Sequence, residues 1–234
     1  VGIGPLLGLY DFKFEILSSI AHSLHLYERF GAHAHTISVP RLRPAEGGGL
    51  DVPPYPVNDD EFKKAVAVLR LTVPSAGVVI STREPARLRK ELLHIGASQL
   101  SAASRTNPGG YTNNGGKETL EQFSTNDHRT LSEVMASIVE EGGLPSLCTA
   151  CYRSGRVGGN FTEKTVNGEM ERFCHANAIL TLKEYIADSS KNGVKGLLQG
   201  ALNAALDEIQ DEAMKKAVME KLKELENGKR DIYF

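Results

Sequence analysis

The chain has three cysteines, and their spacing is the strongest chemical signal in the sequence. Cys148 and Cys151 are separated by two residues, and Cys174 follows after a 22-residue insert. An odd, clustered set of thiols argues against a disulfide framework, which needs cysteines in pairs. Two thiols at this spacing can bind one metal centre from a single turn, and a third can close the site from a distance. The sequence therefore predicts a metal centre on these three thiols.

Two kinds of metal centre remain open for three thiols. A tetrahedral zinc site needs four ligands, and His175, next to Cys174, can supply the fourth. A cubane iron–sulfur cluster normally takes four thiolates, so three thiols leave one iron open to a ligand from outside the protein. Positive charge lowers the pKa of thiols and favours an anionic cluster over zinc. Four basic residues flank the thiols in the sequence: Arg153, Arg156, Lys164 and Arg172.

Histidines form a second group of candidate ligands. His22 and His25 lie on one flank of a predicted helix, and His33 and His35 lie at the entry to a predicted strand. A solvated helix flank and a strand-edge pair explain these positions without any ligand. The sharper hypothesis is that one histidine binds an iron beside the cluster, because imidazole is a common ligand of that metal.

Basic and hydroxyl side chains follow the predicted strands. The C-terminal ends of parallel strands meet at one edge of a sheet, and substrates bind there. A guanidinium group at that edge can bind a carboxylate through two parallel hydrogen bonds, which indicates an acidic small-molecule substrate. An ion pair with a helix-start acid such as Glu84 is the structural alternative, above all for Arg83. The strand-end residues are Arg41, Arg43, Arg83, Ser101, Ser104 and Arg105.

Alternating apolar strands and amphipathic helices must position these residues. Strands are predicted at 2–9, 35–39, 77–82 and 98–102, and helices at 12–30, 60–71, 85–93 and 131–140. In the first helix, four apolar residues repeat with the spacing of a single stripe: Leu17, Ile20, Ala21 and Leu24. Alternating βα units predict a parallel sheet with right-handed crossovers. Four units amount to half of a (β/α)8 barrel, and a small doubly wound sheet is the alternative.

The pattern changes at about residue 142. A Gly-Gly-Leu-Pro segment at 142–145 breaks the βα rhythm, the cysteine region follows, and helices are predicted at 176–188, 194–207 and 211–226. We therefore expect an α/β domain over 1–141 and a mostly helical domain over 142–234. Segments rich in proline and glycine at 44–58 and 106–127 are predicted working loops.

Composition excludes several classes of function. The chain has 27 basic and 29 acidic residues, so neither a nucleic acid nor an acidic membrane is indicated as a partner. It has no run of about 18 apolar residues that predicts a membrane span. The first ten residues lack a secretory signal, and free thiols favour a reducing cytoplasm. The chain opens on Val1 within an apolar run, which we interpret as the tail end of something longer.

Several motifs together carry a resemblance to a known family. The stretch 148–158 (CTACYRSGRVG), preceded by LPS at 144–146 and followed by Phe173-Cys174 and NAILTLKEY at 177–185, closely resembles HydG. HydG proteins are the radical S-adenosylmethionine tyrosine lyases of iron–iron hydrogenase maturation. HTISVPR at 35–41, TREP at 82–85 and SAASR at 101–105 are similar to barrel motifs that HydG shares with its relative ThiH. The resemblance covers essentially the whole chain, and the cysteine motif separates HydG from ThiH.

The resemblance implies a fold and an activity. The fold is the C-terminal half of a (β/α)8 TIM-type barrel followed by a helical domain that binds an auxiliary 4Fe-4S cluster. The family's CxxxCxxC motif, which holds the cluster that cleaves S-adenosylmethionine, is absent, as is the first half of the barrel. In the complete enzyme, tyrosine is split between Cα and Cβ to p-cresol and dehydroglycine, which yields carbon monoxide and cyanide. This chain alone is therefore expected to be inactive.

The resemblance also implies roles for particular residues. Cys148, Cys151 and Cys174 hold the auxiliary cluster, whose open corner binds a free cysteine that carries an additional iron. By spacing, His22 matches the family histidine that binds this iron, with His35 as second choice. Arg83 and Ser101 resemble the residues that bind the tyrosine carboxylate, with Ser104 and Arg105 as neighbours. Residues 4–11 resemble the strand that lies along the adenine of S-adenosylmethionine.

Partners and alternatives follow from the same reading. Other hydrogenase maturation proteins are expected as partners, and a half-barrel with open edges is expected to dimerise or to rearrange its packing. One alternative is a non-enzymatic scaffold for zinc or an iron–sulfur cluster. Another is a ThiH-like 2-iminoacetate synthase. No residue of the chain is assigned a catalytic role by the sequence.

Overall fold

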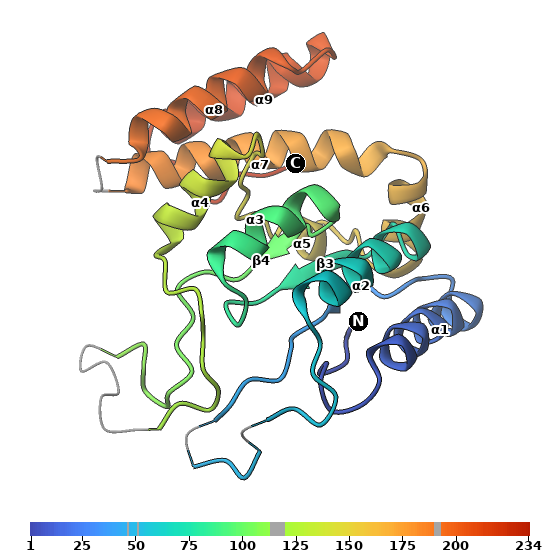
Figure 1. Cartoon of the computed structure of the whole chain (residues 1–234). Coiled ribbons are helices and arrows are strands. Elements are labelled where there is room, and N and C mark those ends of the chain that lie inside the picture. Colours follow the sequence, from blue (N-terminus) through green and yellow to red (C-terminus); the bar gives the residue numbers. More distant parts are fainter. Residues whose placement is uncertain (46, 51, 113–119, 190–192) are drawn as a thin grey trace. The chain divides into compact units, whose positions relative to one another are not determined.

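Four short parallel strands form the sheet in the first part of the computed structural model (Figure 1). They are β1 (Gly2–Ile3), β2 (Thr36–Ser38), β3 (Gly77–Ile80) and β4 (Gln99–Leu100). Each strand pairs with its neighbour in the sequence, in the order β1-β2-β3-β4. The strands of a (β/α)8 barrel follow one another in this order, whereas the strand order of a doubly wound sheet reverses at a switch point. The expected half-barrel is therefore confirmed, and the doubly wound alternative is wrong.

The structure describes residues 1–45, 47–50, 52–112, 120–189 and 193–234. Parts of both predicted working loops, and of the break between two predicted helices, lie outside these residues. The chain divides into two compact units, unit 1 (Val1–Leu131) and unit 2 (Ser132–Phe234). Sequence analysis placed this change after residue 141. The helix α4 (Leu131–Glu140) accounts for the difference, because the Ser132 hydroxyl in unit 2 lies 2.6 Å from the Tyr185 hydroxyl of the same unit.

The first strand is shorter than the predicted 2–9 because its ladder stops at Ile3. Pro5 has no N–H to donate, and pairing resumes only at an isolated bridge between Leu7 and Arg41. Leu7 N–H donates to the Pro40 carbonyl at 2.9 Å across this bridge. Gly4 passes so close to β2 that a Cβ at this position would lie 2.0 Å from the Ser38 carbonyl oxygen. Only glycine fits this close approach.

Three helices follow the first three strands, and each has a clear start or end signal. The helix α1 (Phe12–Phe30) begins after Asp11, whose carboxylate accepts from Lys13 N–H at 2.8 Å, and it ends at the left-handed Gly31. The helix α2 (Asp59–Thr72) begins with a capping box between Asn58 and Glu61. The helix α3 (Ala86–Ile95) follows Pro85. Local sequence therefore sets the bounds of these helices.

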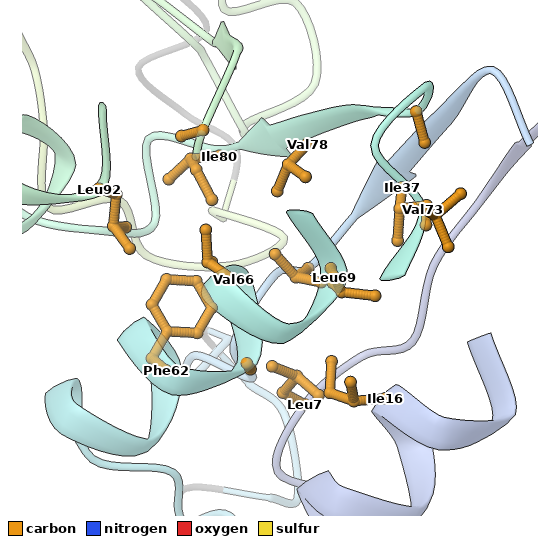
Figure 2. Close-up of a cluster of buried hydrophobic side chains, with 14 of the residues drawn as sticks. Leu7, Ile16, Ile37, Phe62, Val66, Leu69, Val73, Val78, Ile80 and Leu92 are labelled. Atoms are coloured by element: carbon orange, nitrogen blue, oxygen red, sulfur yellow. The ribbon is translucent and has the colours of Figure 1, made fainter. Parts of the chain in front are cut away.

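The core of unit 1 lies between the helices and one face of the sheet. Figure 2 shows Phe62, Val66 and Leu69 of α2 beside Val78 and Ile80 of β3, and all five side chains are buried. Burying each such side chain stabilises the fold by about 1.5–3 kcal/mol relative to leaving it exposed. The alternate residues of β3 are only half-buried, so the other face of the sheet is less covered.

The predicted apolar stripe of α1 is wrong in part. Leu17 and Leu24 are exposed, and the buried face carries Ile16, Ser19 and Ser23 instead. The Ser23 hydroxyl accepts from Ala34 N–H at 3.2 Å, so this serine ties the buried face of α1 to the segment before β2. A second apolar stripe of α1 therefore stays uncovered within unit 1.

Unit 2 is helical. Besides α4 it contains α5 (Ala150–Arg153), α6 (Gly158–Val166), α7 (Glu169–Asp188), α8 (Lys195–Asp207) and α9 (Glu212–Glu226). The helix α7 packs against α6, α8 and α9 and supplies the centre of the core, with Ile179, Leu180 and Leu182 buried. It begins seven residues earlier than predicted, so Cys174 lies on a helix. Within the described part of the chain, every helix is too short or too polar to cross a membrane.

Candidate functional site

The three thiols belong to two segments of unit 2. Cys148 and Cys151 lie in residues 148–156, which we call the thiol loop and which includes the single-turn helix α5; Cys174 lies on α7. All three cysteines are free of disulfides, Cys174 is exposed, and the other two are half-buried. The Ala150 N–H donates to Cys148 Sγ at 3.3 Å. A sulfur that accepts an amide N–H is better suited to the thiolate form that metals bind.

The thiols are close enough to influence one another. Burial raises the pKa of the Cys174 thiol, the charges of Cys151 and Cys148 raise it further, and Arg156 lowers it. A cation bound among the thiolates would relieve this repulsion. Among the residues that the structure describes, however, no three His, Cys, Asp or Glu side chains stand in a metal-binding arrangement. The three thiols are thus neighbours, but as described they are not arranged to bind one metal ion together.

The surroundings fit an anionic cluster better than zinc. Arg156 is buried, its guanidinium lies 4.7 Å from the centre of the Phe173 ring, and its Nε has no hydrogen-bond partner among the described atoms. This leaves a cationic donor beside the thiols. His175, the predicted fourth zinc ligand, has its Nε2 2.8 Å from the Ala205 carbonyl oxygen. That nitrogen is engaged within the helical core, so His175 could bind zinc only through Nδ1.

A pocket of about 260 Å³ opens beside Cys148. The thiol loop lines one side through Cys148, Thr149 and Arg153, and α7 and the chain end line the rest. Three carboxylates lie on that second side, and sequence analysis assigned none of them to the site: Glu184, Asp188 and Asp231.

Two of the predicted strand-end arginines are occupied by ion pairs. The Arg41 Nε donates to the two Glu84 oxygens at 3.1 and 3.0 Å, and Arg43 Nη2 donates to Glu84 Oε2 at 3.0 Å. Arg41 also pairs with Asp59 at 2.9 Å. Glu84 is 1% exposed, so this cluster is part of the core. The structural alternative of an ion pair to Glu84 therefore applies to Arg41 and Arg43.

Arg83 differs from Arg41 and Arg43, although the sequence makes an ion pair to Glu84 a stronger alternative for Arg83 than for the other two. It has no ion pair with any carboxylate in the described part of the chain; its Nη1 donates to the Arg41 carbonyl at 3.2 Å and its guanidinium lies 3.7 Å from the centre of the Phe123 ring. Burial lowers the pKa of Arg83, and Arg43 contributes to the shift in the same direction. Its remaining N–H donors are available to a carboxylate ligand.

The predicted hydroxyls lie after β4, at the same edge of the sheet. Ser101 and Ser104 are half-buried, and Arg105 is exposed, with its N–H donating to the Tyr111 hydroxyl at 2.9 Å. The Ser101 N–H donates to the Ile80 carbonyl at 3.1 Å. The structure therefore places Arg83 and Ser101 after adjacent strands.

A buried charge network that sequence analysis missed holds these strand ends. Arg89 donates to Asp127 and to the Ser101 carbonyl, and Arg129 donates to Asp127 through Nε at 2.9 Å and Nη2 at 2.6 Å. Asp127 N–H donates to the Thr82 carbonyl at 3.1 Å. Burial opposes the ionisation of Asp127, but hydrogen bonds from Arg129 and the charge of Arg89 outweigh it and lower the pKa to about 2. The sequence signal for this network is Arg89, a charged residue on the apolar face of α3 between Leu88 and Leu92.

The two candidate histidines lie elsewhere in unit 1. His22 is exposed on α1. His35 lies just before β2, at the edge where the strands begin, and not at the edge where Arg83 and Ser101 lie. Burial and the amino group of Val1 lower the pKa of His35. A role for either histidine as an iron ligand stays a prediction.

Comparisons with known proteins bear on both units. The family model described as "Biotin and Thiamin Synthesis associated domain" matches residues 38–143 and so ends before Cys148. The 2-iminoacetate synthase of Escherichia coli strain K12 is 32% identical over 147 residues, which is 62% of this chain and 38% of that protein. The 2-iminoacetate synthase of Salmonella typhimurium is 31% identical over 147 residues.

Solved structures match the chain more completely. A crystal structure of HydG, described as a maturase of the FeFe-hydrogenase, is 44% identical with a TM-score of 0.93 and covers 100% of this chain and 50% of that one. HydG from Carboxydothermus hydrogenoformans is 38% identical with a TM-score of 0.75 and covers 94% of this chain. The chain thus spans about half the length of these relatives. In sequence and in structure, the chain therefore corresponds to about half of a HydG protein.

Proposed function

We propose that this chain carries the auxiliary iron–sulfur cluster of a HydG-type tyrosine lyase on Cys148, Cys151 and Cys174. One observation carries the proposal: a buried arginine joins the two segments of unit 2 that carry the three free thiols. The Arg156 backbone N–H donates to the Cys151 carbonyl at 2.9 Å, and its guanidinium lies 4.7 Å from the ring centre of Phe173, the residue before Cys174. The likeness to HydG extends over the whole chain and therefore includes this region.

Bound there, a cluster with three protein thiolates supplies one open iron site for a ligand from outside the protein. A free cysteine that carries an additional iron is the proposed ligand of that site, and this iron would be the substrate to which carbon monoxide and cyanide are added for hydrogenase maturation. The chain's own residues hold and tune the site. Ala150 N–H donates to Cys148 Sγ, and the guanidinium of Arg156 offsets negative charge near Cys174.

The strand-end site is the proposed place for the tyrosine carboxylate. Arg83 offers guanidinium donors that are not committed to a carboxylate of the described chain, and Ser101 lies after the adjacent strand. Ser104 and Arg105 are the neighbouring candidates. S-adenosylmethionine and its own 4Fe-4S cluster belong, in this proposal, mainly to the part of a HydG chain that this chain does not span, with residues 4–11 along the adenine.

Anaerobic reconstitution of the chain with iron and sulfide tests the cluster proposal. We expect about four iron and four sulfide per chain and a cubane signal in electron paramagnetic resonance (EPR) after reduction. Added cysteine should change that spectrum, because the open iron is its binding site. Stoichiometric zinc without a cubane signal would support the alternative of a zinc scaffold and contradict the proposal.

A 2-iminoacetate synthase is the second candidate function. It is favoured by the curated relatives and by the matched family model, both of which concern a similar barrel part. The model's match ends at residue 143, however, and the three thiols lie beyond it. Uptake of a cluster on Cys148, Cys151 and Cys174 favours the HydG-type activity, and a chain that takes up no cluster favours the synthase.

We also propose that the isolated chain does not turn over and that it self-associates in the reducing cytoplasm. Among the described residues, β1 and β4 each pair with one neighbouring strand, so both edges of this sheet are open. Exposed apolar side chains of α1 add to this surface: Phe14, Leu17, Leu24 and Phe30. Light scattering after gel filtration should report a dimer or larger species, and a monodisperse monomer would contradict self-association.

A further inference from the structure

The last five residues of the chain run back along one face of α7. We call residues 230–234 the tail. Arg230 pairs with Asp188 through Nε at 2.9 and 3.0 Å and through Nη2 at 2.7 Å. Asp231 N–H donates to Glu184 Oε2 at 2.9 Å, and Phe234 N–H donates to Asn177 Oδ1 at 2.8 Å. The three α7 residues are four and seven positions apart, so they share one helix face.

The same tail contacts the thiol loop through two arginines. Arg153, on the helix that carries Cys151, donates through Nη1 and Nη2 to the Asp231 carboxylate at 2.7–2.8 Å. Its guanidinium also lies 4.1 Å from the centre of the Tyr233 ring. Arg156 donates to the Phe234 carbonyl. The tail therefore contacts the loop at two points, 78 residues away in the sequence.

The contact at Arg156 extends to the other thiol segment. The Arg156 guanidinium lies against the ring of Phe173, the residue before Cys174. The backbone N–H of Arg156 donates to the Cys151 carbonyl at 2.9 Å, and this bond closes the turn after α5. One arginine thus touches the tail, the thiol loop and the α7 residue next to the third cysteine.

The thiol loop needs such support because its own structure is slight. The helix α5 has four residues, and Gly155 and Gly158 after it have left-handed backbones with φ of 66° and 58°. Asp231 also has a left-handed backbone, with φ of 61°, which is uncommon for a residue with a side chain. Both its N–H and its carboxylate are engaged there, so its contacts hold this conformation in place.

We propose that Asp231 and Tyr233 are positioning residues for the cluster site. Through Arg153 and Arg156 the tail holds the thiol loop against α7, so that Cys148 and Cys151 stay within reach of the same cluster as Cys174. The inference rests on the proposed function, because it takes these thiols to be cluster ligands.

Alkylation of the metal-free, reduced chain tests the positioning directly. The rate of iodoacetamide labelling at each cysteine is measured by peptide mass spectrometry in the wild type and in an Asp231→Asn, Tyr233→Ala double variant. Asparagine keeps the left-handed backbone while it removes the charge. We expect Cys148 and Cys151 to label about threefold to tenfold faster, because one exposed ion pair and one cation–π contact are lost.

Two further variants separate positioning from general loosening of the unit. Lys183→Gln is the matched control, since the ion pair between Lys183 and Glu226 at 2.9 Å joins α7 to α9 and not to the thiol loop. Its labelling rates should stay at the wild-type values. Arg153→Gln should behave like Asp231→Asn alone, and their combination should add little, because both remove the same pair. Equal labelling in the tail variant and the control overturns the proposal.

Cluster loading completes the test. After anaerobic reconstitution, the tail variant should retain less iron and give a broader EPR signal than Lys183→Gln. Unchanged iron content and line shape, despite faster labelling, also overturn the proposal. A wild-type chain that takes up no cluster contradicts the proposed function instead, while the labelling of the metal-free chain still decides whether the tail holds the loop. Circular dichroism identifies any variant that unfolds, and Tyr233→Ala alone then replaces it.

Discussion

The two candidate sites differ in how much of their geometry is fixed without a ligand. In unit 1, the strand ends are held by buried charges: Glu84 binds two arginines, and Asp127 binds Arg89 and Arg129. In unit 2, Cys151 lies on the single-turn helix α5, Cys148 lies two residues before it, and Cys174 is at an exposed position of α7. Their side-chain support comes from partly exposed pairs such as Arg153–Asp231. The contacts within the described chain therefore fix the strand ends of unit 1 more tightly than the thiol segments of unit 2.

The largest effect is expected from breaking the buried network of unit 1. Asp127→Ala leaves Arg89, which is fully buried, without its counter-charge. Removing one partner of a buried pair destabilises a protein by about 3–5 kcal/mol. Urea unfolding should show a loss of this size. Arg87→Gln is the control on the same helix as Arg89, and it breaks more exposed pairs with Asp59 of α2 and Glu91 of α3. It should change the free energy of unfolding by less than about 1 kcal/mol. Similar losses in both variants would contradict the rigidity assigned to the strand ends.

A smaller effect is expected when the cluster binds to unit 2. A ligand at 100 times its dissociation constant stabilises the state that binds it by about 2.7 kcal/mol. Amide hydrogen exchange should therefore slow in residues 146–156 and 170–176 after reconstitution. Exchange at β3 and around Ser101 should stay the same, because no ligand is needed to hold them. Protection that rises equally in both units would erase the contrast between the two sites.

Sequence predicted the elements that carry the candidate residues, but not the contacts that support them. The strands, the helices of unit 1 and the cysteine trio depend on periodicity, capping residues and spacing, which are local properties. The supports join distant residues: Arg89 and Asp127 are 38 positions apart, and Arg153 and Asp231 are 78 apart. No local pattern reports such pairs.

The errors in the local elements have the same origin. Leu17 and Leu24 have the spacing of a core face, but Ser19 and Ser23 lie on the buried side of α1, where their hydroxyls bond to main-chain groups. The start of α7 was placed too late because its first turns, with Glu169, Glu171 and Arg172, are polar and largely exposed. Tertiary contacts decide these cases, and the pattern of one segment does not contain them.

Acid should weaken unit 1 through Asp127. Its pKa is lowered from 3.8 to about 2 in the folded chain, so its contribution to stability is fully present above about pH 4 and is lost as pH falls towards 2. The full contribution is about 2 kcal/mol, since one pKa unit corresponds to 1.36 kcal/mol. Urea unfolding of the wild type and Asp127→Asn at several pH values checks this. The difference between them should shrink as pH falls from 4 to 2, and a constant difference would contradict the role of this carboxylate.

The smallest effect on stability is expected at Arg83, and it shows that the contrast also divides unit 1 itself. Arg83→Gln removes one hydrogen bond to the Arg41 carbonyl and a contact with the Phe123 ring, which together contribute about 1 kcal/mol. Arg41→Gln is the matched control, and it should destabilise the chain several times more because Glu84 loses a buried partner. Tyrosine binding, measured by equilibrium dialysis, should weaken at least about tenfold in Arg83→Gln, because a guanidinium–carboxylate pair is lost. If Arg83→Gln instead unfolds the chain as readily as Arg41→Gln, Arg83 belongs with the structural ion pairs and not with the binding site.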